Sequence, residues 1–499
     1  MSDVFIGIDV STTASKAVAI DAAGAVLATS SHEHPFFTPE PMWVEQNPDD
    51  WWQTTIQALK GVLQTVNAVD VKAIGLTGQM LGLVALDEHG TPVRPSILWN
   101  DQRSGKQCDE ITDTIGAEKL WQLTGSLMIP GMTVPKLLWM REHEPDNYAE
   151  VRHVLLPKDY VRYRLSGEFV TDVSDGSGTG LMDVGARDWS DEMLAALEIP
   201  REWLPGVVES PEICATVTDE AAAATGLTAG TPIVGGAGDQ PAGAIGMGIV
   251  GAGATSLTVG TSGVLFTASD RYSPDPQGRG HSWCHAVPGQ WCLMGVMQSA
   301  AGSLQWLRTM LEATSSYDDM NAAVADVPIG SLGLLFAPYL TGERHPHPDP
   351  LARGAFVGLT LRSEQPQLMR ATMEGVAFGL SDLVELARAQ GIQPSSARVS
   401  GGAANSPVWR QIMADVMGFP LYSVNAGEGG AYGAAILASV GGGAHTDVAS
   451  ACEAMIEAGD RTSPGEAERA RYEQLYAIFR KLYPTLKDVY ADLADFEAS

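Results

Sequence analysis

Apolar runs at the start of the chain predict three consecutive β-strands. The first, Val4–Val10, is rich in β-branched residues, and it is followed by apolar segments over Lys16–Ile20 and Ala25–Thr29. Small polar residues at positions 11–14 separate the first two segments. The pattern therefore predicts a three-stranded meander with one acidic residue, Asp9, at its first corner.

The same strand–turn–strand pattern returns about half a chain later. Ser256–Val259 leads into a turn of Gly and hydroxyl residues at positions 260–263, and Val264–Thr267 follows. A strand, a turn of such residues and a second strand also form a common hairpin, so the pattern alone is compatible with a hairpin that is unrelated to the first one. The half-chain spacing favours an internally duplicated, two-lobed α/β protein.

Strand and helix patterns alternate between the two hairpins. Val71–Leu76 and Thr231–Val234 have the composition of strands, and Asp49–Val66 carries apolar residues on one helical face. This alternation favours parallel sheets with ligand sites at the carboxyl ends of the strands. The Gly-rich stretch at residues 246–253 predicts a boundary between an N-terminal domain, 1–247, and a C-terminal domain, 248–499.

The end of the chain has a helical pattern. Ser463 and Glu466 have the spacing of a capping box, with Pro464 at the first helical position. Apolar residues then recur at helical intervals from Tyr472 to Tyr483. We expect this face to pack in the core rather than to bind a partner.

The composition limits the classes of partner that the chain is expected to bind. The 499 residues include 31 Lys and Arg against 60 Asp and Glu, which gives a formal charge of −29. This balance argues against a nucleic-acid groove or an anionic membrane surface, because both require clustered cations. A phosphate ligand remains compatible, since backbone amides and a metal ion can hold it.

Cysteine usage and the first residues predict a reduced, cytoplasmic protein. The five cysteines contain no CxxC pair, so neither a disulfide framework nor a structural zinc site is indicated. The start, Met1–Val4, has no basic segment of a signal peptide, and no apolar run approaches the roughly 18 residues of a membrane span. We expect no membrane association, and the sequence leaves a homodimer open.

The strongest local candidate for chemistry is Asp239, within the Gly-rich segment Gly235–Gly243 that follows the strand Thr231–Val234. Glycines there let the backbone approach a ligand closely, and an acid at the tip can meet a hydroxyl or a metal. Alternatively Asp239 is an N-cap with Pro241 in the first turn, whose amides would keep the carboxylate ionised and weakly basic. Asp9, at the end of the first strand, is a candidate for water-mediated Mg²⁺ binding, with an Asx turn as the local alternative.

Longer segments carry a family resemblance. Gly131–His143 and Gly354–Glu374 match both signatures of the FGGY carbohydrate kinases, which the chain resembles from Ile6 to beyond Ala438. Blocks at Ile97–Asp101, Leu156–Tyr160 and Tyr339–Arg344 are similar to those of the xylulokinases within that family.

The resemblance implies a two-lobed, actin-like and ribonuclease-H-like duplicated α/β fold with a cleft between the lobes. It implies ATP and Mg²⁺ as cofactors, sugar binding mainly by the N-terminal lobe and nucleotide binding by the C-terminal lobe. Asp239 matches the general base and Asp9 the Mg²⁺ ligand, so both are expected to be catalytic and to hold the metal. The residues expected to contact sugar are Met80, Leu81, Trp99, Asp239 and Gln240. The residues expected to contact nucleotide are Thr12, Thr13, Gly260, Thr261, Ser262, Gly263, Gly401, Gly402, Ala403 and Asn405.

The expected activity is ATP-dependent phosphorylation of a ketopentose at its terminal hydroxyl, with D-xylulose converted to D-xylulose 5-phosphate. Leu81 stands where xylulokinases usually carry His, and Gln240 where they usually carry Asn. Both departures fall on the sugar side, so another ketose, a deoxyketose or a polyol is the alternative substrate. Two further classes are an actin-like or chaperone ATPase, which needs an added partner surface, and a sugar-sensing pseudokinase, against which the presence of Asp9 and Asp239 argues.

Overall fold

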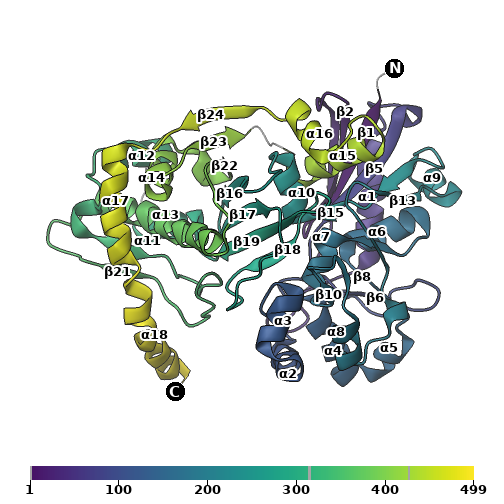
Figure 1. Cartoon of the computed structure of the whole chain (residues 1–499), viewed down its shortest axis with the longest axis horizontal. Helices are drawn as coiled ribbons and strands as arrows, with labels where there is room; N and C mark the ends of the chain where they lie inside the picture. Colours follow the sequence, from purple (N-terminus) through teal and green to yellow (C-terminus); the bar gives the residue numbers. More distant parts are fainter. Residues whose placement is uncertain (1–2, 313–315, 425–427, 499) are drawn as a thin grey trace. The chain divides into compact units, whose positions relative to one another are not determined.

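The fold is described from a computed structural model of the chain (Figure 1). The structure describes residues 3–312, 316–424 and 428–498. These residues form two compact units, which we call unit 1 and unit 2. Unit 1 comprises 3–251, 268–292 and 428–457, and unit 2 comprises 252–267, 293–312, 316–424 and 458–498. None of the helices in the described ranges is long and apolar enough to cross a membrane.

Unit 1 is built on a sheet that contains the predicted meander. The strands β1 (Val4–Val10), β2 (Ala14–Asp21) and β3 (Val26–Glu33) pair antiparallel, as their sequence pattern predicts. On the other side of β1 lie β5 and β14, both parallel to their neighbour, and β13 closes the edge antiparallel. Their bounds are Val71–Gly78 for β5, Pro232–Val234 for β14 and Ile213–Thr216 for β13, with β15 (Ala237–Gly238) also paired to β5.

Unit 2 repeats this topology. Its strands lie in the order β19-β17-β16-β22-β23-β24, with β16 antiparallel to β17, parallel to β22, and β23 antiparallel to β24. The order and directions match those around β1 in unit 1, which confirms the predicted duplication. The bounds are β16 Thr255–Val259, β17 Gly263–Ser269, β19 Trp291–Met297, β22 Ala397–Ser400, β23 Leu421–Val424 and β24 Ala458–Thr462.

Two helices from distant parts of the chain cover the two faces of the unit 1 sheet. Residues 4, 6, 8 and 10 of β1 belong to the core cluster beneath α1 (Pro48–Val62), whereas Phe5 belongs to the cluster of α15 (Gly429–Gly441). This alternation follows from the two-residue period of a strand. In Figure 1, α15 lies in yellow beside the purple strands.

Glycine permits the close contact between α15 and the sheet. A Cβ atom on Gly7 would lie 1.9 Å from the carbonyl oxygen of Ala431, and one on Gly75 would lie 2.1 Å from that of Ala434. Either distance is far inside van der Waals contact, so only glycine fits at these two strand positions. The helix therefore packs directly onto the backbone of β1 and β5.

The C-terminal helical pattern forms two helices, α17 (Glu466–Phe479) and α18 (Leu482–Ala498). Tyr472 and Phe479 are buried in the core of unit 2, as predicted. The predicted Ser463 cap is wrong, because the N-cap is Gly465. Tertiary hydrogen bonds explain the difference: the Ser463 carbonyl accepts from Gln411, and the Gly465 N–H donates to Asp415 at 2.8 Å.

The remaining helices complete the two units. In unit 1 they are α2 (Gly105–Ile115), α3 (Ala117–Thr124), α4 (Thr133–His143), α5 (Pro145–Glu150), α6 (Pro157–Ser166), α7 (Val173–Gly176), α8 (Asp191–Leu197), α9 (Asp219–Thr225), α10 (Asp239–Gly246) and α16 (Val448–Met455). In unit 2 they are α11 (Ala301–Met310), α12 (Tyr317–Ala325), α13 (Gln365–Ala389) and α14 (Pro407–Met417).

Candidate active site

Two acidic residues lie at neighbouring strand ends in unit 1. Asp9 is the penultimate residue of β1, and Asp239 follows β15 as the first residue of α10. The two strands flank β5, where Asp9 is in register with Thr77 and Gly238 with Gly78. The topology thus brings together the two acids that the sequence singled out.

Both carboxyl groups have raised pKa values. Burial raises the pKa of Asp239 to about 7, and the charge of Asp9 adds to this rise against a smaller lowering by Gln240. Burial likewise raises the pKa of Asp9 to about 6, although Lys16 lowers it in part. Since a general base works best with a pKa near the working pH, Asp239 has the property that proton abstraction requires.

The interpretation of Asp239 as a helix cap is wrong. The N-cap of α10 is Gly238, and no side-chain capping bond is made at this terminus. The backbone and side chain of Gln240 interact with the carboxylate, but burial outweighs them. Asp239 is consequently a stronger base than a capping carboxylate would be.

Asp9 and Thr77 each have an unpartnered oxygen atom. The Oδ1 atom of Asp9 and the hydroxyl of Thr77 are buried, and neither has a hydrogen-bond partner within the described part of the chain. A Cβ atom on Gly430, near the start of α15, would lie 3.5 Å from Oδ2 of Asp9 and 3.2 Å from Cγ2 of Thr77. Thr77 was not identified from the sequence, because only the β1–β5 register places it beside Asp9.

The pair expected to contact sugar lies at the end of β5. A Cβ atom on Gly238 would lie 2.7 Å from the sulfur of Met80, so Met80 packs against the residue that precedes Asp239. Leu81 is 9% exposed and has a φ of 72°, in the left-handed region. The structure therefore places Met80 against the residue that precedes Asp239. The next residue, Leu81, has a backbone conformation that is unfavourable for leucine.

Trp99 and Thr12 are joined by a hydrogen bond. The indole N–H of Trp99 donates to the hydroxyl of Thr12 at 3.0 Å, and that hydroxyl donates to Oε1 of Gln79 at 3.3 Å. Gln46 continues the network by donating to the Thr12 carbonyl at 2.7 Å and accepting from Gln79 at 2.8 Å. Thr12, which is expected near the phosphates, thus contacts Trp99, which is expected near the sugar. The neighbouring Thr13 is exposed.

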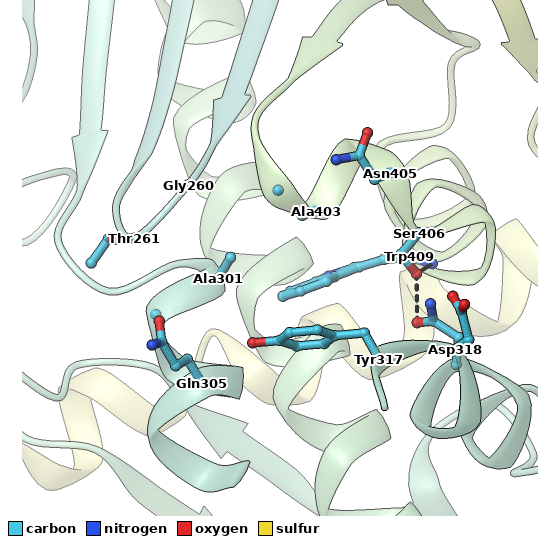
Figure 2. Close-up of a pocket in the computed structure, with 13 residues that line it drawn as sticks. Gly260, Thr261, Ala301, Gln305, Tyr317, Asp318, Ala403, Asn405, Ser406 and Trp409 are labelled. Carbon is cyan, nitrogen blue, oxygen red and sulfur yellow. Dashed lines mark hydrogen bonds between the residues drawn. The ribbon is translucent and has the colours of Figure 1, made fainter. Parts of the chain in front are cut away.

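Unit 2 contains a separate cavity of about 430 Å³. It lies at the ends of β16 and β22, where turns of the duplicated fold meet helices α11, α12 and α14 (Figure 2). Five of the predicted nucleotide residues line it: Gly260, Thr261, Gly402, Ala403 and Asn405. Ser262, Gly263 and Gly401 belong to the same turns but do not line it.

Backbone hydrogen bonds hold the first of these turns against α11. The N–H groups of Ala301 and Gly302 donate to the carbonyls of Gly260 and Thr261 at 2.8 and 3.2 Å. A Cβ atom on Gly302 would approach the Thr261 oxygen to 3.0 Å. The second turn depends on Gly401, whose φ of 89° favours glycine.

The opposite wall of the cavity was missed by the sequence analysis. Figure 2 shows the rings of Tyr317 and Trp409 one above the other. The dashed line in that figure is a 2.8 Å hydrogen bond from Ser406 to Asn321. Serines cap both contributing helices, which is a local signal for helix starts, but only the tertiary fold brings the two starts together. The full set of missed residues is Ala301, Gly302, Gln305, Tyr317, Asp318, Asn321, Ser406 and Trp409.

Comparisons with known proteins give matches to one family of enzymes over nearly the whole chain. Profiles for the N-terminal and C-terminal domains of the FGGY family of carbohydrate kinases match residues 4–246 and 255–442. Xylulose kinase of Escherichia coli is 40% identical over 97% of this chain and 99% of its own, and that of Bacillus subtilis is 34% identical over 98% and 99%. The crystal structure of a Brucella ovis enzyme described as a "xyloylose kinase" superposes with a TM-score of 0.92 at 34% identity, over 97% of this chain and 100% of that one. The chain therefore belongs to the FGGY family of carbohydrate kinases.

Proposed function

We propose that this carbohydrate kinase transfers the γ-phosphoryl group of ATP to the terminal hydroxyl of a ketopentose and converts D-xylulose to D-xylulose 5-phosphate. The names of the E. coli and B. subtilis relatives support this substrate. The observation that carries the catalytic assignment is the position of Asp239, beside Met80 and with a pKa raised to about 7.

In the proposed reaction Asp239 is the general base. The hydroxyl oxygen of the sugar forms a bond to the γ-phosphorus, the bond from that phosphorus to the ADP oxygen breaks, and the hydroxyl proton passes to the Asp239 carboxylate. In phosphoryl transfer, positioning and electrostatics contribute most of the rate enhancement. Asp239 therefore both orients the hydroxyl and accepts its proton, with Met80, Leu81, Trp99 and Gln240 forming the sugar side of the pocket.

The residues present fit a magnesium ion. The buried Oδ1 atom of Asp9 has no hydrogen-bond partner within the described residues, so it is available as a metal ligand. Mg²⁺ suits such a site, because it is usually held by one or two carboxylates, waters and substrate phosphates. Asp9 and Asp239 would hold it, and when bound it supplies positive charge to the phosphate oxygens.

The cavity of unit 2 is proposed to take the nucleoside of ATP. Its volume falls within the range of about 300–1,000 Å³ that is typical of small-ligand sites. Its aromatic wall and its two backbone turns suit a base and a phosphate chain, respectively. In this assignment residues 1–247 bind sugar, with Thr12 and Thr13 toward the phosphates, and residues 248–499 bind nucleotide, with Ser262, Gly263 and Gly401 completing the turns.

The net charge of the chain also supports an enzyme that acts on small molecules. A net charge of −29 opposes binding to nucleic acid, whose backbone is itself anionic. We therefore propose ATP and a sugar as the partners of the chain, and a cytoplasmic location where both are available.

The apolar side chain of Leu81 favours a second candidate substrate, a deoxyketose. A pocket that does not hydrogen-bond a hydroxyl discriminates against analogues that lack it by less than about 10²-fold. A coupled ADP-release assay across D-xylulose, 1-deoxy-D-xylulose, D-ribulose, xylitol and D-gluconate tests both candidates. We expect D-xylulose to have the highest kcat/KM, with the deoxyketose within about tenfold of it. A polyol or an aldonate that exceeds D-xylulose would overturn the proposal.

A further inference from the structure

One buried lysine contacts carbonyl groups instead of carboxylates. Lys136, on α4, is 0% exposed, and its Nζ atom donates to the carbonyl oxygens of Leu81 at 2.9 Å and Gly131 at 2.5 Å. No carboxylate in the described ranges lies within ion-pair distance of it. Burial lowers the pKa of Lys136 to about 7, and the charge of Asp101 opposes this only in part. The buried amino group therefore depends on these two carbonyl acceptors to offset its loss of hydration.

The Leu81 carbonyl is held twice. In addition to Lys136, the hydroxyl of Thr133 donates to it at 3.0 Å. Leu81 has a φ of 72°, a conformation that L-residues with large side chains rarely adopt. Such a conformation persists only where the surrounding structure over-determines it. The two donors on the first turn of α4 supply that constraint, and we call them the α4 clamp.

Gly178 accommodates the Leu81 side chain, and Gly131 lies at ordinary contact distance from it. A Cβ atom on Gly178 would lie 2.4 Å from Cδ2 of Leu81, and one on Gly131 would lie 3.8 Å from Cδ1. Gly131 is also the second carbonyl that Lys136 contacts. The lysine thus fixes both the backbone of Leu81 and one wall of the slot that its side chain fills.

Met80 links Leu81 to the acidic pair. Met80 precedes Leu81 and packs against Gly238, the residue before Asp239, so a change in the Leu81 backbone displaces the side chain beside the base. We propose that Lys136 and Thr133 are positioning residues that set the sugar-binding conformation of Met80 and Leu81. This inference rests on the proposed sugar site and deepens it, because it assigns the shape of that site to two residues that do not touch sugar.

Kinetics of Thr133→Val and Lys136→Met test the role. Val keeps the shape of Thr without its hydroxyl, and Met keeps an unbranched side chain one atom shorter than that of Lys, without its amino group. We expect each variant to raise KM for D-xylulose by about tenfold or more while KM for ATP and kcat change by less than about threefold. Lys106→Met is the matched control, because Lys106 is exposed on the neighbouring helix α2 and pairs with Glu142. An unchanged KM for D-xylulose in Thr133→Val, which is the milder variant, overturns the proposal even if Lys136→Met does not fold.

A double-mutant cycle with Leu81→Gly tests the mechanism. Glycine adopts the left-handed conformation at little cost, so a clamp on Leu81 becomes dispensable in that background. We expect the rise in KM caused by Thr133→Val to shrink below about threefold when Leu81 is Gly. An equal rise in both backgrounds overturns the assigned role of the Leu81 conformation.

Failure of the proposed function is distinguishable from failure of the clamp. If the wild-type chain phosphorylates none of the ketoses, the substrate assignment fails. The clamp is then judged by urea unfolding of the four proteins of the cycle, which are the wild type, Thr133→Val, Leu81→Gly and the double variant. If the changes in unfolding free energy caused by Thr133→Val and Leu81→Gly do not add up in the double variant, the result supports the clamp. Additive values overturn it.

Discussion

The hydroxyl of Ser174 accepts a 3.2 Å hydrogen bond from the backbone N–H of Gly238, the residue that precedes Asp239, the proposed base. Ser174 in turn donates to Oδ2 of Asp172 at 2.5 Å, and Oδ1 of Asp172 lies 2.9 Å from Nζ of the buried Lys158. The peptide before Asp239 is therefore fixed by a buried ionic cluster that lies behind the site.

Ser174→Ala should slow turnover without weakening substrate binding in proportion. The change leaves the buried Gly238 N–H without an acceptor and loosens the peptide that carries Asp239. We expect kcat to fall about tenfold, with KM for sugar within about threefold. Ser439→Ala is the control, since that buried hydroxyl bonds only within its own helix. Equal kinetics in both variants would show that Ser174 does not position the base.

Asp175→Asn and Asp172→Asn should differ in stability. Lys158 and Arg162 supply two positive charges to three buried carboxylates, and burial holds the pKa of Asp175 well above its usual range. The raised pKa favours the neutral form of the Asp175 carboxyl, and Asn preserves that charge state. We expect Asp175→Asn to change the free energy of unfolding by less than about 1 kcal/mol and Asp172→Asn to lower it by about 3 kcal/mol. Urea unfolding measures both, and equal losses would contradict the assigned proton.

Asp239→Asn should retain sugar binding and lose turnover. Asn cannot accept the hydroxyl proton, so kcat should fall by about 10²-fold or more. In the wild-type enzyme kcat/KM should decline as the pH falls below about 7, because the pKa of Asp239 is about 7 and only its ionised form is basic. Steady-state rates from pH 5 to pH 9 provide the measurement. Near-normal turnover in a folded Asp239→Asn preparation would remove Asp239 from its role.

The same variant should be more stable than the wild type at alkaline pH. Below about pH 4 the Asp239 carboxyl is protonated in both the folded and the unfolded chain. As the pH rises to about 7, it ionises first in the unfolded chain, so the wild type loses stability that Asn does not lose. We expect Asp239→Asn to raise the free energy of unfolding by roughly 2 kcal/mol at pH 8 and not to change it at pH 4. The gain at pH 8 is smaller than the full pKa shift implies, because the Asp239 side chain is partly exposed and solvent screens its charge.

Thermal unfolding in the presence of a chelator measures this difference free of bound metal. A gain that persists at pH 4 would show that Asn stabilises the fold for a reason other than ionisation. A variant that is less stable at pH 8 would contradict the raised pKa itself.

Tyr317→Ala should weaken ATP binding. Tyr317 is half exposed at the wall of the unit 2 cavity, facing the buried Trp409, and stacking on such rings contributes about 1–3 kcal/mol per base. We expect KM for ATP to rise about tenfold, with KM for sugar unchanged, and Tyr317→Phe to behave like the wild type because it keeps the ring. An unchanged KM for ATP would place the nucleoside outside this cavity.

Local patterns predicted the parts of the molecule that short-range physics determines. The run Val4–Val10 forms a strand with those bounds, and Asp9 lies near its end. Asp239 follows the segment of β14, whose apolar composition made it recognisable, and the short strand β15. The repeated hairpin at Gly260 was recognisable because glycine and hydroxyl residues specify tight turns.

Features that depend on tertiary contact were not predictable in this way. Thr77 lies beside Asp9 only through the register of β1 and β5, and Tyr317 and Trp409 line one cavity only because two helix starts converge. At Ser463 the local signal was present but was overridden, because hydrogen bonds to α14 hold that segment outside the helix.

The glycine-lined contact between α15 and the strands β1 and β5 has a consequence for biosynthesis. These strands leave the ribosome first, whereas the helix that covers one of their faces begins only at Gly429. Until that helix is translated, Phe5 and the other apolar residues on this face have no covering layer. Unit 1 consequently completes its fold only after α15 has been translated, and until then its nascent sheet exposes an apolar face of the kind that promotes aggregation.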